Sequence, residues 1–501
     1  MKRFNSLLDM ITVEHLWAIT VMVGIIAFLN THPIRPHDFW WHMAIGRDIV
    51  SEGKIPLVDT YSYTQPGDPY LSYHQFWLME VVLYQLFTIG GAVLVILAQT
   101  IMIAPAYFLL MWVSWRLTQN WRAAAFGVMF AAALGFGNWN VRPQAISYLF
   151  GALVLLFIEE YRRTRRPVWL GLFTVVMALW VNCHGSFPIG LILVGLWLAD
   201  ESWKVFKYWL QKKKWSFQNW LPALAGFFLA LLGCLVNPRG IGFVSYLSMM
   251  AGNSVVQTFI LEWMPPNFNS LEGIIFFALF MLAVVLLALS PRRPSFYQMT
   301  TFLLFGVLGL KYIRGIIWFG IVMAPIIAEH LAALMDKAGI KPAPKPTPQT
   351  RRLNLVFILA LLFLAFISLP WFKQYWPVVP EKAGLISAET PVQATQYLLD
   401  HQLPAQVFHD MAFGSYLMWA AQPKYKVFVD SRIELYPMKI WEDYLAISSG
   451  ECDWEAKLSQ YGVSTLLLEP KKQVGLIEAA SVAPDWQEVY RDDQAVIFTR
   501  R

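Results

Sequence analysis

The stretch FWLMEVVLYQLFTIGG, residues 76–91, decides how this chain of 501 residues crosses a membrane. The stretch is apolar enough to span, but on a helix its polar residues and the preceding His74 would lie within a single arc. These are His74, Glu80, Tyr84, Gln85 and Thr88. A helix with one polar and one apolar face is typical of a surface helix. We therefore expect residues 76–90 to lie flat on the membrane; the alternative is that they span and that one weak later span does not.

The composition predicts an α-helical protein with many membrane spans. Hydrophobic residues make up 57% of the chain and charged residues 14%, whereas soluble domains carry about 25% charged residues. A spanning helix needs about 20 apolar residues. Eleven segments are candidates, several of them short: 14–30, 92–117, 121–138, 144–161, 168–183, 187–203, 220–236, 271–290, 297–312, 315–335 and 352–370.

The basic residues predict the orientation of these spans, because Lys and Arg collect in cytoplasmic loops. Eighteen of them fall on every second loop, and four fall on the loops between. Lys2 and Arg3 place the N-terminus inside, so residues 31–75 lie outside after the first span. Arg116 must lie inside. Only an odd number of crossings fits between residues 31–75 and Arg116, and we assign the single crossing to 92–117. The sequence thus predicts a multi-pass protein of the plasma (inner) membrane with a cytoplasmic N-terminus. The basic pI reflects cytoplasmic loops and not a nucleic-acid partner.

The last span then exits outside, so residues 371–501 are expected to form an external domain. They carry 12 basic and 17 acidic residues, a balance typical of a soluble domain. The runs KVFVD, VSTLLLE and AVIFTR indicate strands, and helices are expected at 391–400, 411–420 and 474–483. We predict a small α/β domain behind a membrane domain of residues 1–370, whose external loop is 31–91. The three cysteines are far apart and indicate neither a disulfide framework nor a metal cluster.

Five predicted outer loops carry polar or basic residues at membrane depth. They contribute Asp38, Arg142, His184, Arg239, and the pair Lys311 and Arg314. A charge in the membrane is costly unless it faces a cavity or a partner. These residues therefore predict a polar cavity that opens on the outer face. Basic groups there suit an anionic lipid headgroup, and a carboxylate suits general base catalysis.

The first outer loop resembles that of the GT-C superfamily of integral-membrane glycosyltransferases. The shared pattern is an acid directly after the first span, a surface helix, and a second surface helix that begins with His and ends with Gly. Here these are Asp38, residues 39–51, and His74 to Gly91. The run VFHDMAFGSYLMWAAQPKYKVFVDSRIELYP resembles the tail of uncharacterised bacterial members. Aminoarabinose transferases and protein O-mannosyltransferases belong to this superfamily, and the middle of the chain matches it by topology.

The resemblance implies a sugar transfer on the external face, from a polyprenyl-phosphate donor to a hydroxyl of a lipid, polysaccharide or protein. Asp38 would be the catalytic base, with Glu80 as a candidate second acid. The donor phosphate would be bound by Arg142, Arg239, Arg314 and His184, and accessory roles would fall to His42, Asp59 and His74. Some branches carry a second acid beside the first. Phe39 stands there instead, which argues against a required divalent metal, and no metal ligand is assigned.

Structural roles compete with these catalytic ones. Asp38 suits the N-cap of a helix that starts at Phe39, Asp59 suits a turn, and Glu80 on a surface helix suits solvent. Trp40 and Trp41 are typical of an interfacial aromatic belt. Arginines at span ends often extend to lipid headgroups. In the tail, internal salt bridges are expected for Asp410, Asp430, Arg432 and Glu434.

Two other classes of protein remain as alternatives. A transporter or flippase predicts repeated halves and charged residues in the middle of spans, and the sequence has neither: segments such as 92–113 carry none. A non-catalytic membrane scaffold would account for the tail but not for five polar outer loops. The sequence therefore favours the glycosyltransferase.

Overall fold

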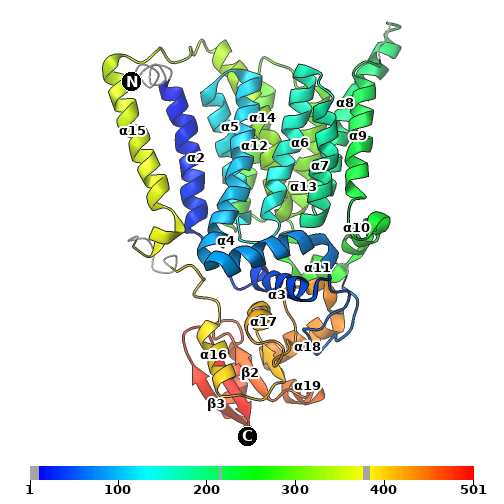
Figure 1. Ribbon diagram of the computed structural model, residues 1–501, viewed down its shortest axis with the longest axis vertical. Coiled ribbons are helices and arrows are strands. Elements are labelled where there is room, and N and C mark those ends of the chain that lie inside the picture. The colour runs from blue at the N-terminus through cyan, green and yellow to red at the C-terminus, as the bar shows by residue number, and fades with distance from the viewer. Residues whose placement is uncertain (1–10, 71, 214–216, 376–383) are drawn as a thin grey trace. The chain divides into compact units, whose positions relative to one another are not determined.

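The computed structural model describes residues 11–70, 72–213, 217–375 and 384–501 (Figure 1). The chain forms two compact units. Unit 1 comprises residues 1–32, 96–243 and 261–373, and unit 2 comprises residues 33–95, 244–260 and 374–501. The sequence suggested a division after residue 370. In the structure the first loop belongs to the same unit as the tail.

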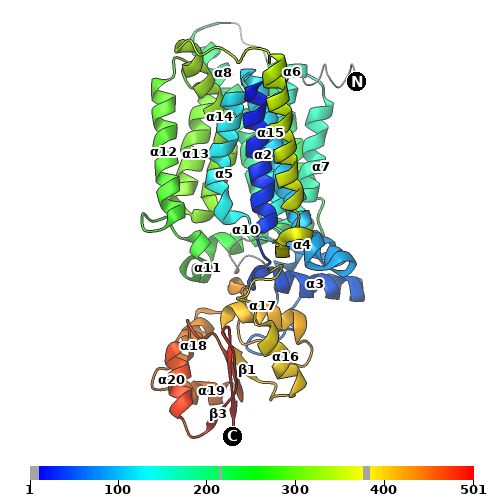
Figure 2. The same ribbon diagram turned by 90° about the vertical axis from the view of Figure 1, so that its left-hand side faces the viewer.

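Unit 1 is a bundle of apolar helices that correspond to the predicted spans. They are α2 (Val13–Thr31), the second part of α4 (Tyr73–Thr118), α5 (Trp121–Gly135), α6 (Ala145–Thr164), α7 (Val168–Cys183), α8 (Pro188–Leu210), α9 (Trp220–Cys234), α12 (Leu271–Leu289), α13 (Phe296–Lys311), α14 (Ile313–Lys337) and α15 (Pro348–Ile367). Among the described residues, five of these helices are long and apolar enough to cross a membrane. Figure 2 shows α2 and α15 side by side. Eleven crossings remain a prediction.

Small residues let the central helices of unit 1 pack closely. Helix α14 packs against α5 and α13, and most residues of its apolar segment are buried. A Cβ added to Gly127 on α5 would lie only 2.3 Å from the carbonyl oxygen of Ala324 on α14. Close approach through small residues is typical of membrane helices, because dispersion contacts hold them together where no hydrophobic effect operates.

Helix α4 changes direction inside the stretch that opened the sequence analysis. Gly90 and Gly91 have non-helical backbone angles, and φ of Gly91 is +61°, a conformation that glycine adopts without a steric cost. The first part of α4, up to Val95, belongs to unit 2, and the remainder belongs to unit 1. The predicted boundary between 76–90 and 92–117 therefore coincides with a real break. Whether the first part lies on a membrane surface remains a prediction.

Unit 2 contains a four-stranded sheet built from the tail. Its strands are β1 (Val407–His409), β2 (Thr465–Leu468), β3 (Trp486–Arg491) and β4 (Val496–Arg500). The order is β1-β2-β4-β3, with β1 and β2 parallel and the other pairs antiparallel. The strands predicted in VSTLLLE and AVIFTR are β2 and β4. The strand predicted in KVFVD is wrong, because this segment makes only an isolated bridge between Val427 and Ser62.

Helices surround this sheet and include all three that the tail sequence predicts. The tail contributes α16 (Val392–Asp400), α17 (Met411–Ala420), α18 (Met438–Ser449), α19 (Trp454–Gln460) and α20 (Val474–Val482). The first loop contributes α3 (Asp38–Glu52), which packs against α17. The stretch between the bundle helices contributes α10 (Phe243–Gly252) and α11 (Ser254–Phe259). Three distant parts of the sequence thus build one unit.

The tryptophans of the first loop belong to the core of unit 2. Trp40 is 1% exposed and contacts Tyr416 and Trp419 of α17. Trp41 is 4% exposed and packs against Tyr70. The prediction that both lie in an interfacial aromatic belt is therefore wrong. Their large apolar surfaces stabilise the contact between the loop and the tail.

Candidate functional site

Two of the predicted phosphate-binding arginines meet in unit 1. Arg142 lies in the loop before α6, and Arg314 lies in the first turn of α14. Both bind the carboxylate of Glu262, which belongs to the short 3-10 helix η3 (Leu261–Trp263). Arg314 donates from Nε to Oε2 at 2.9 Å, and Arg142 donates from a terminal nitrogen to Oε1. One carboxylate therefore holds two guanidinium groups.

The charges of this cluster keep Glu262 ionised. Burial alone would raise the pKa of Glu262, but the charges of Arg142 and Arg314, and then their hydrogen bonds, hold it well below its usual range. With two positive charges and one negative charge, the Arg142–Glu262–Arg314 cluster has a net charge of +1. A partly exposed cluster with surplus positive charge is suited to binding an anion.

His184 lies next to this cluster as a neutral side chain. It follows the last residue of α7, and its Nδ1 is 2.8 Å from the hydroxyl of Ser186. Burial, followed by the positive charges of Arg314 and Arg142, lowers the pKa of His184 to about 3. At neutral pH, His184 can therefore contribute a hydrogen bond to a ligand but no positive charge.

The third predicted arginine lies on a neighbouring loop. The side chain of Asn182 donates to the carbonyl of Val236 at 2.6 Å, which brings the loop after α9 to the end of α7. Arg239 follows on this loop, and its Nη1 is buried without a hydrogen-bond partner among the described residues. A buried guanidinium nitrogen with no acceptor is costly, so a ligand acceptor would suit it. Lys311 is exposed, with its ammonium over the ring of Tyr312.

The predicted catalytic base lies in unit 2 at the start of α3. The helix begins at Asp38 itself and its N-cap is His37, so the prediction that Asp38 caps a helix starting at Phe39 is wrong by one residue. A carboxylate in the first turn is favoured by the helix dipole. Asp38 is half-buried, and His37 is exposed beside it.

Glu80 and His42 form a buried pair. Nδ1 of His42 lies 2.9 Å from Oε1 of Glu80, with side-chain exposures of 5% and 0%. The expectation that Glu80 is solvated on a surface helix is therefore wrong. Its second carboxylate oxygen has no hydrogen-bond partner among the described residues. His42 also stacks on Trp41, with ring centroids 3.5 Å apart, so the pair holds α3 against α4.

A second arginine cluster joins the first loop to the tail. Arg432 is fully buried and donates to both oxygens of Asp430, from Nε at 2.9 Å and from Nη2 at 2.6 Å. Its Nη1 donates to Asp59 at 2.5 Å and to the hydroxyl of Tyr73 at 2.7 Å. Burial alone would raise the pKa of Asp430, but the Arg432 charge and the hydrogen bonds from Arg432 and Tyr436 lower it. Asp59 thus has a larger structural role than a turn residue.

The other predicted tail acids also have structural partners. Glu434 accepts hydrogen bonds from Tyr70 at 2.7 Å and from Ser72 at 2.8 Å. Asp410 caps α17 through the amide of Ala412. Internal salt bridges are therefore confirmed for Asp430, Arg432 and Asp410, the last with Lys472 at 3.5 Å, whereas Glu434 is held by the hydroxyl groups of Tyr70 and Ser72. His74 is the second residue of α4.

No metal centre is formed by the part of the chain that the structure describes. Within these residues, there is no group of three or more His, Cys, Asp or Glu side chains that could hold a metal ion. The predicted site residues instead fall into two sets. Arg142, Arg239, Arg314 and His184 belong to unit 1, and Asp38, His42, Asp59, His74 and Glu80 belong to unit 2.

Glu262 is the functional residue that the sequence analysis missed. It is the one acidic residue in the stretch 237–270, which was treated as a long outer loop. An isolated carboxylate in such a loop could have been matched to the basic residues of the other outer loops. Its partners lie 120 and 52 positions away in the sequence, so only the fold identifies them.

Comparison with known proteins gives a similarity of fold. No protein-family model matches the chain, and no curated protein matches it. The arabinofuranosyltransferase AftD from Mycobacteria is similar with a TM-score of 0.58 and 12% sequence identity, over 98% of this chain and 42% of that one. The chain thus spans less than half the length of AftD.

Two further solved structures show weaker similarity. ArnT from Cupriavidus metallidurans, bound to undecaprenyl phosphate, has a TM-score of 0.48 and 14% identity, over 96% of this chain and 97% of that one. The oligosaccharyltransferase of Archaeoglobus fulgidus has a TM-score of 0.47 and 11% identity, over 90% and 68%.

The structural neighbours are GT-C glycosyltransferases. The resemblance drawn from the first loop and the tail is therefore confirmed at the level of the fold. Together with the apolar helices, the fold indicates a multi-pass membrane protein.

Proposed function

We propose that the protein transfers a sugar from a polyprenyl-phosphate donor to a hydroxyl acceptor on the external face of the plasma membrane. The observation that carries this proposal is the Arg142–Glu262–Arg314 cluster, a positively charged site at the ends of membrane helices. The fold similarity to glycosyltransferases supports the same reaction class. The acceptor is a lipid, a polysaccharide or a protein.

Asp38 is the proposed base in this reaction. The acceptor hydroxyl gives its proton to the Asp38 carboxylate while its oxygen attacks the anomeric carbon of the sugar. The bond from that carbon to the phosphate oxygen breaks, and the phosphate keeps the electron pair. The donor phosphate thereby changes from a monoanion to a dianion, with the proton left on Asp38.

The arginines act on the phosphate in which this charge develops. A guanidinium group stabilises a leaving phosphate more strongly as its negative charge grows, and this lowers the barrier. Arg142 and Arg314 offer surplus positive charge, and neutral His184 offers a hydrogen bond. Arg239 offers a buried nitrogen that has no hydrogen-bond partner among the residues the structure describes.

A transfer assay with the Asp38→Asn variant tests this function. The full chain in detergent is given undecaprenyl phosphate carrying a radiolabelled pentose or hexose, and release of the label to an acceptor extract is measured. Loss of a general base is expected to slow transfer by at least about 10²-fold. The matched control is Asp68→Asn, because Asp68 is an exposed carboxylate of the same loop. Full transfer by Asp38→Asn would contradict the assignment.

A further inference from the structure

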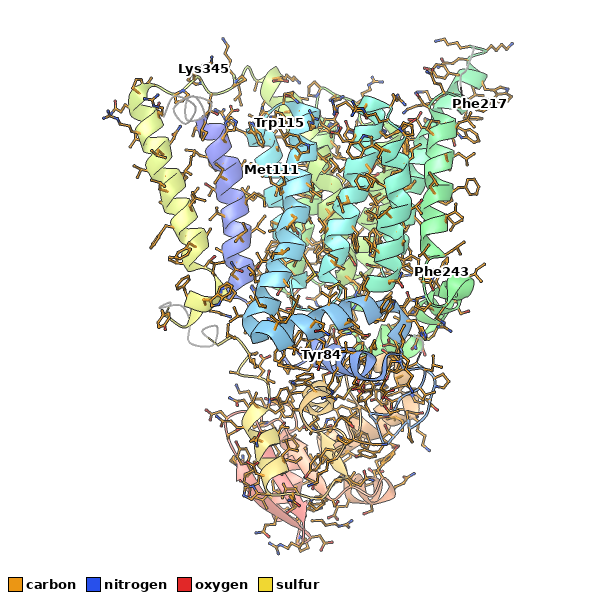
Figure 3. The ribbon with its side chains drawn as sticks, in the orientation of Figure 1. Tyr84, Met111, Trp115, Phe217, Phe243 and Lys345 are labelled. Atoms are coloured by element: carbon orange, nitrogen blue, oxygen red, sulfur yellow. The ribbon has the colours of Figure 1, made fainter. Side chains whose placement is uncertain are left out.

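A second charged cavity lies within unit 1, apart from the arginine cluster described above. It has a volume of about 430 Å³ and is bordered by α4, α6, α8, α13 and α14. Its lining includes Arg162 and Arg165 near the end of α6, and Arg292 and Arg293 before α13. Figure 3 labels Trp115, Phe217 and Lys345 at this end of the bundle and Phe243 at the other. The cavity therefore opens among the basic loops, which the sequence predicts to be cytoplasmic.

One part of the cavity wall is apolar. Leu155, Ile158, Val322 and Ile326 line it, together with Val113, Leu117 and Pro325. Burial of a hydrocarbon chain against such a wall is favourable in proportion to the apolar area removed from water. The cavity thus combines a charged rim with an apolar wall, which is the pattern that an amphiphile requires.

Most charges on the rim neutralise one another. Asp200 binds Arg162 at 3.3 Å and Lys204 at 2.8 Å. Glu201 also binds Lys204 at 2.8 Å, and Glu329 binds Arg292 at 2.5 Å. Three acidic residues are therefore matched by three basic ones.

The remaining rim charges leave a surplus of +1. Arg165 contacts the ring of Tyr161, and Arg293 has no ion-pair partner among the described residues. Glu159 is the fourth acidic residue of the lining and is half-buried. Arg165 and Arg293 have no carboxylate partner within the described part of the chain, and together with the one carboxylate of Glu159 they leave a charge that matches a single negative charge.

We propose that this cavity binds an anionic phospholipid, with its phosphodiester on Arg165 and Arg293 and one acyl chain on the apolar wall. A phosphodiester headgroup carries one negative charge, equal to the surplus on the rim. Basic pockets between membrane helices on the cytoplasmic side are suited to such headgroups. The site takes no part in the proposed sugar transfer, and its ligand is distinct from the donor.

Native mass spectrometry of the full chain in detergent tests the site with two probes, phosphatidylglycerol and phosphatidylcholine. Arg165→Gln combined with Arg293→Gln is expected to weaken phosphatidylglycerol binding by about tenfold, since charge-assisted hydrogen bonds to phosphate are lost. Arg166→Gln is the control, because Arg166 is exposed in the same loop and does not line the cavity. Equal binding of both lipids, or an unchanged affinity in the double variant, would overturn the proposal.

Misfolding could also weaken lipid binding in the double variant, so a second variant is chosen that is expected to strengthen binding. Glu159→Gln removes the opposing carboxylate and is expected to strengthen phosphatidylglycerol binding by about threefold. A phosphatidylglycerol with a photoreactive acyl chain should label the peptides that contain Leu155, Val322 or Ile326. Labelling only elsewhere overturns the site. Inorganic phosphate that binds with the same dependence on Arg165 and Arg293 would assign the cavity to a free anion instead of a lipid.

Discussion

Two arginine clusters in this protein use the same chemical groups in opposite proportions. In unit 1, Arg142 and Arg314 share one carboxylate, Glu262, and the cluster has a net charge of +1. In unit 2, Arg432 alone binds two carboxylates, Asp59 and Asp430. The first cluster has positive charge to offer a ligand. The second has none, because each guanidinium nitrogen of Arg432 donates to a protein acceptor and its charge is matched by two carboxylates.

Solvent exposure separates the two clusters in the same way. The side chains of Arg432, Asp59 and Asp430 are all 0% exposed, whereas those of Arg142, Glu262 and Arg314 are 13%, 23% and 29% exposed. An anionic ligand can therefore reach only the Arg142–Glu262–Arg314 cluster. A buried ion pair costs much desolvation and is kept only with good geometry and further hydrogen bonds.

The comparison teaches that the charge ratio and the exposure of a cluster decide its role. The Arg432 cluster fastens residues 59–73 to residues 430–436, with the rings of Tyr61 and Tyr70 packed on its guanidinium. The Arg142–Glu262–Arg314 cluster is partly exposed and carries surplus charge. Its carboxylate holds two arginines in place, which suits the proposed binding of an anion.

The largest expected effect is the loss of stability in Arg432→Met. Methionine keeps much of the side-chain volume but leaves Asp59 and Asp430 buried without their cation. Removing one partner of a buried ion pair costs about 3–5 kcal/mol. The apparent thermal unfolding midpoint of the full chain in detergent should fall accordingly, and limited proteolysis should cut unit 2 first.

The control for this variant is Arg491→Met. Arg491 is 48% exposed and pairs with Glu488 on the surface of β3, so its loss is expected to cost at most about 1 kcal/mol. Adding Asp59→Asn and Asp430→Asn to Arg432→Met should restore part of the midpoint, because the unpaired charges are removed. Equal midpoints for Arg432→Met and Arg491→Met would mean that the buried cluster does not hold the unit together.

The next effect in size is the loss of anion affinity in Arg314→Gln. The variant reduces the net charge of its cluster from +1 to 0, so binding of undecaprenyl phosphate should weaken by about tenfold, or roughly 1.4 kcal/mol. Arg142→Gln should behave alike. Isothermal titration calorimetry of the full chain in detergent measures the affinity. Lys311→Gln, an exposed charge change beside α14, should leave it unaltered.

The sequence was enough to predict the bundle helices, three of the tail helices and the break in α4. Apolar runs located the bundle helices, and the polar arc of 76–90 with its two glycines located the break in α4. These features depend on neighbours in the sequence, which is why they could be predicted. KVFVD, a β-prone segment, failed as a strand because tertiary contacts with residues 61–64 occupy its backbone.

Partnerships between distant residues could not be predicted in the same way. Glu80 has the periodicity of a solvated residue, yet α3 covers it and His42 binds it. The local sequence around Asp59 indicates a turn residue, but in the fold Asp59 binds Arg432, which lies 373 positions later in the sequence. Trp40 and Trp41 suit a membrane belt by composition, but contacts with α17 bury Trp40, and contacts with Tyr70 and Phe76 bury Trp41. The candidate base Asp38 and the three arginines were found because charges are rare in this chain.

A smaller effect of opposite sign is expected for Glu262→Gln. The two arginines donate to different oxygens of the carboxylate, so the amide oxygen of glutamine can accept from only one of them, and the cluster gains one positive charge. Undecaprenyl phosphate should therefore bind about threefold more tightly, or by roughly 0.7 kcal/mol. Asp336→Asn makes the same charge change at the exposed far end of α14 and should have no effect. Weaker binding by Glu262→Gln would show that the carboxylate supports the phosphate site instead of competing with it.

The smallest expected effect is on the pH dependence of binding in His184→Gln. The folded pKa of His184 is lowered to about 3, so the imidazole is neutral from pH 5 to pH 8 and gains its proton only as the pH falls toward 3. An ordinary histidine, with a pKa near 6.5, would add a positive charge and strengthen phosphate binding below that pH. The affinity of His184→Gln for undecaprenyl phosphate should therefore differ from that of the parent chain by a constant factor across this range. The lipid phosphate titrates in the same way with both proteins, so it cannot change the ratio of their affinities. If this ratio changes between pH 6 and pH 7, the change is due to His184. His184 would then gain its proton in the physiological range, contrary to the prediction.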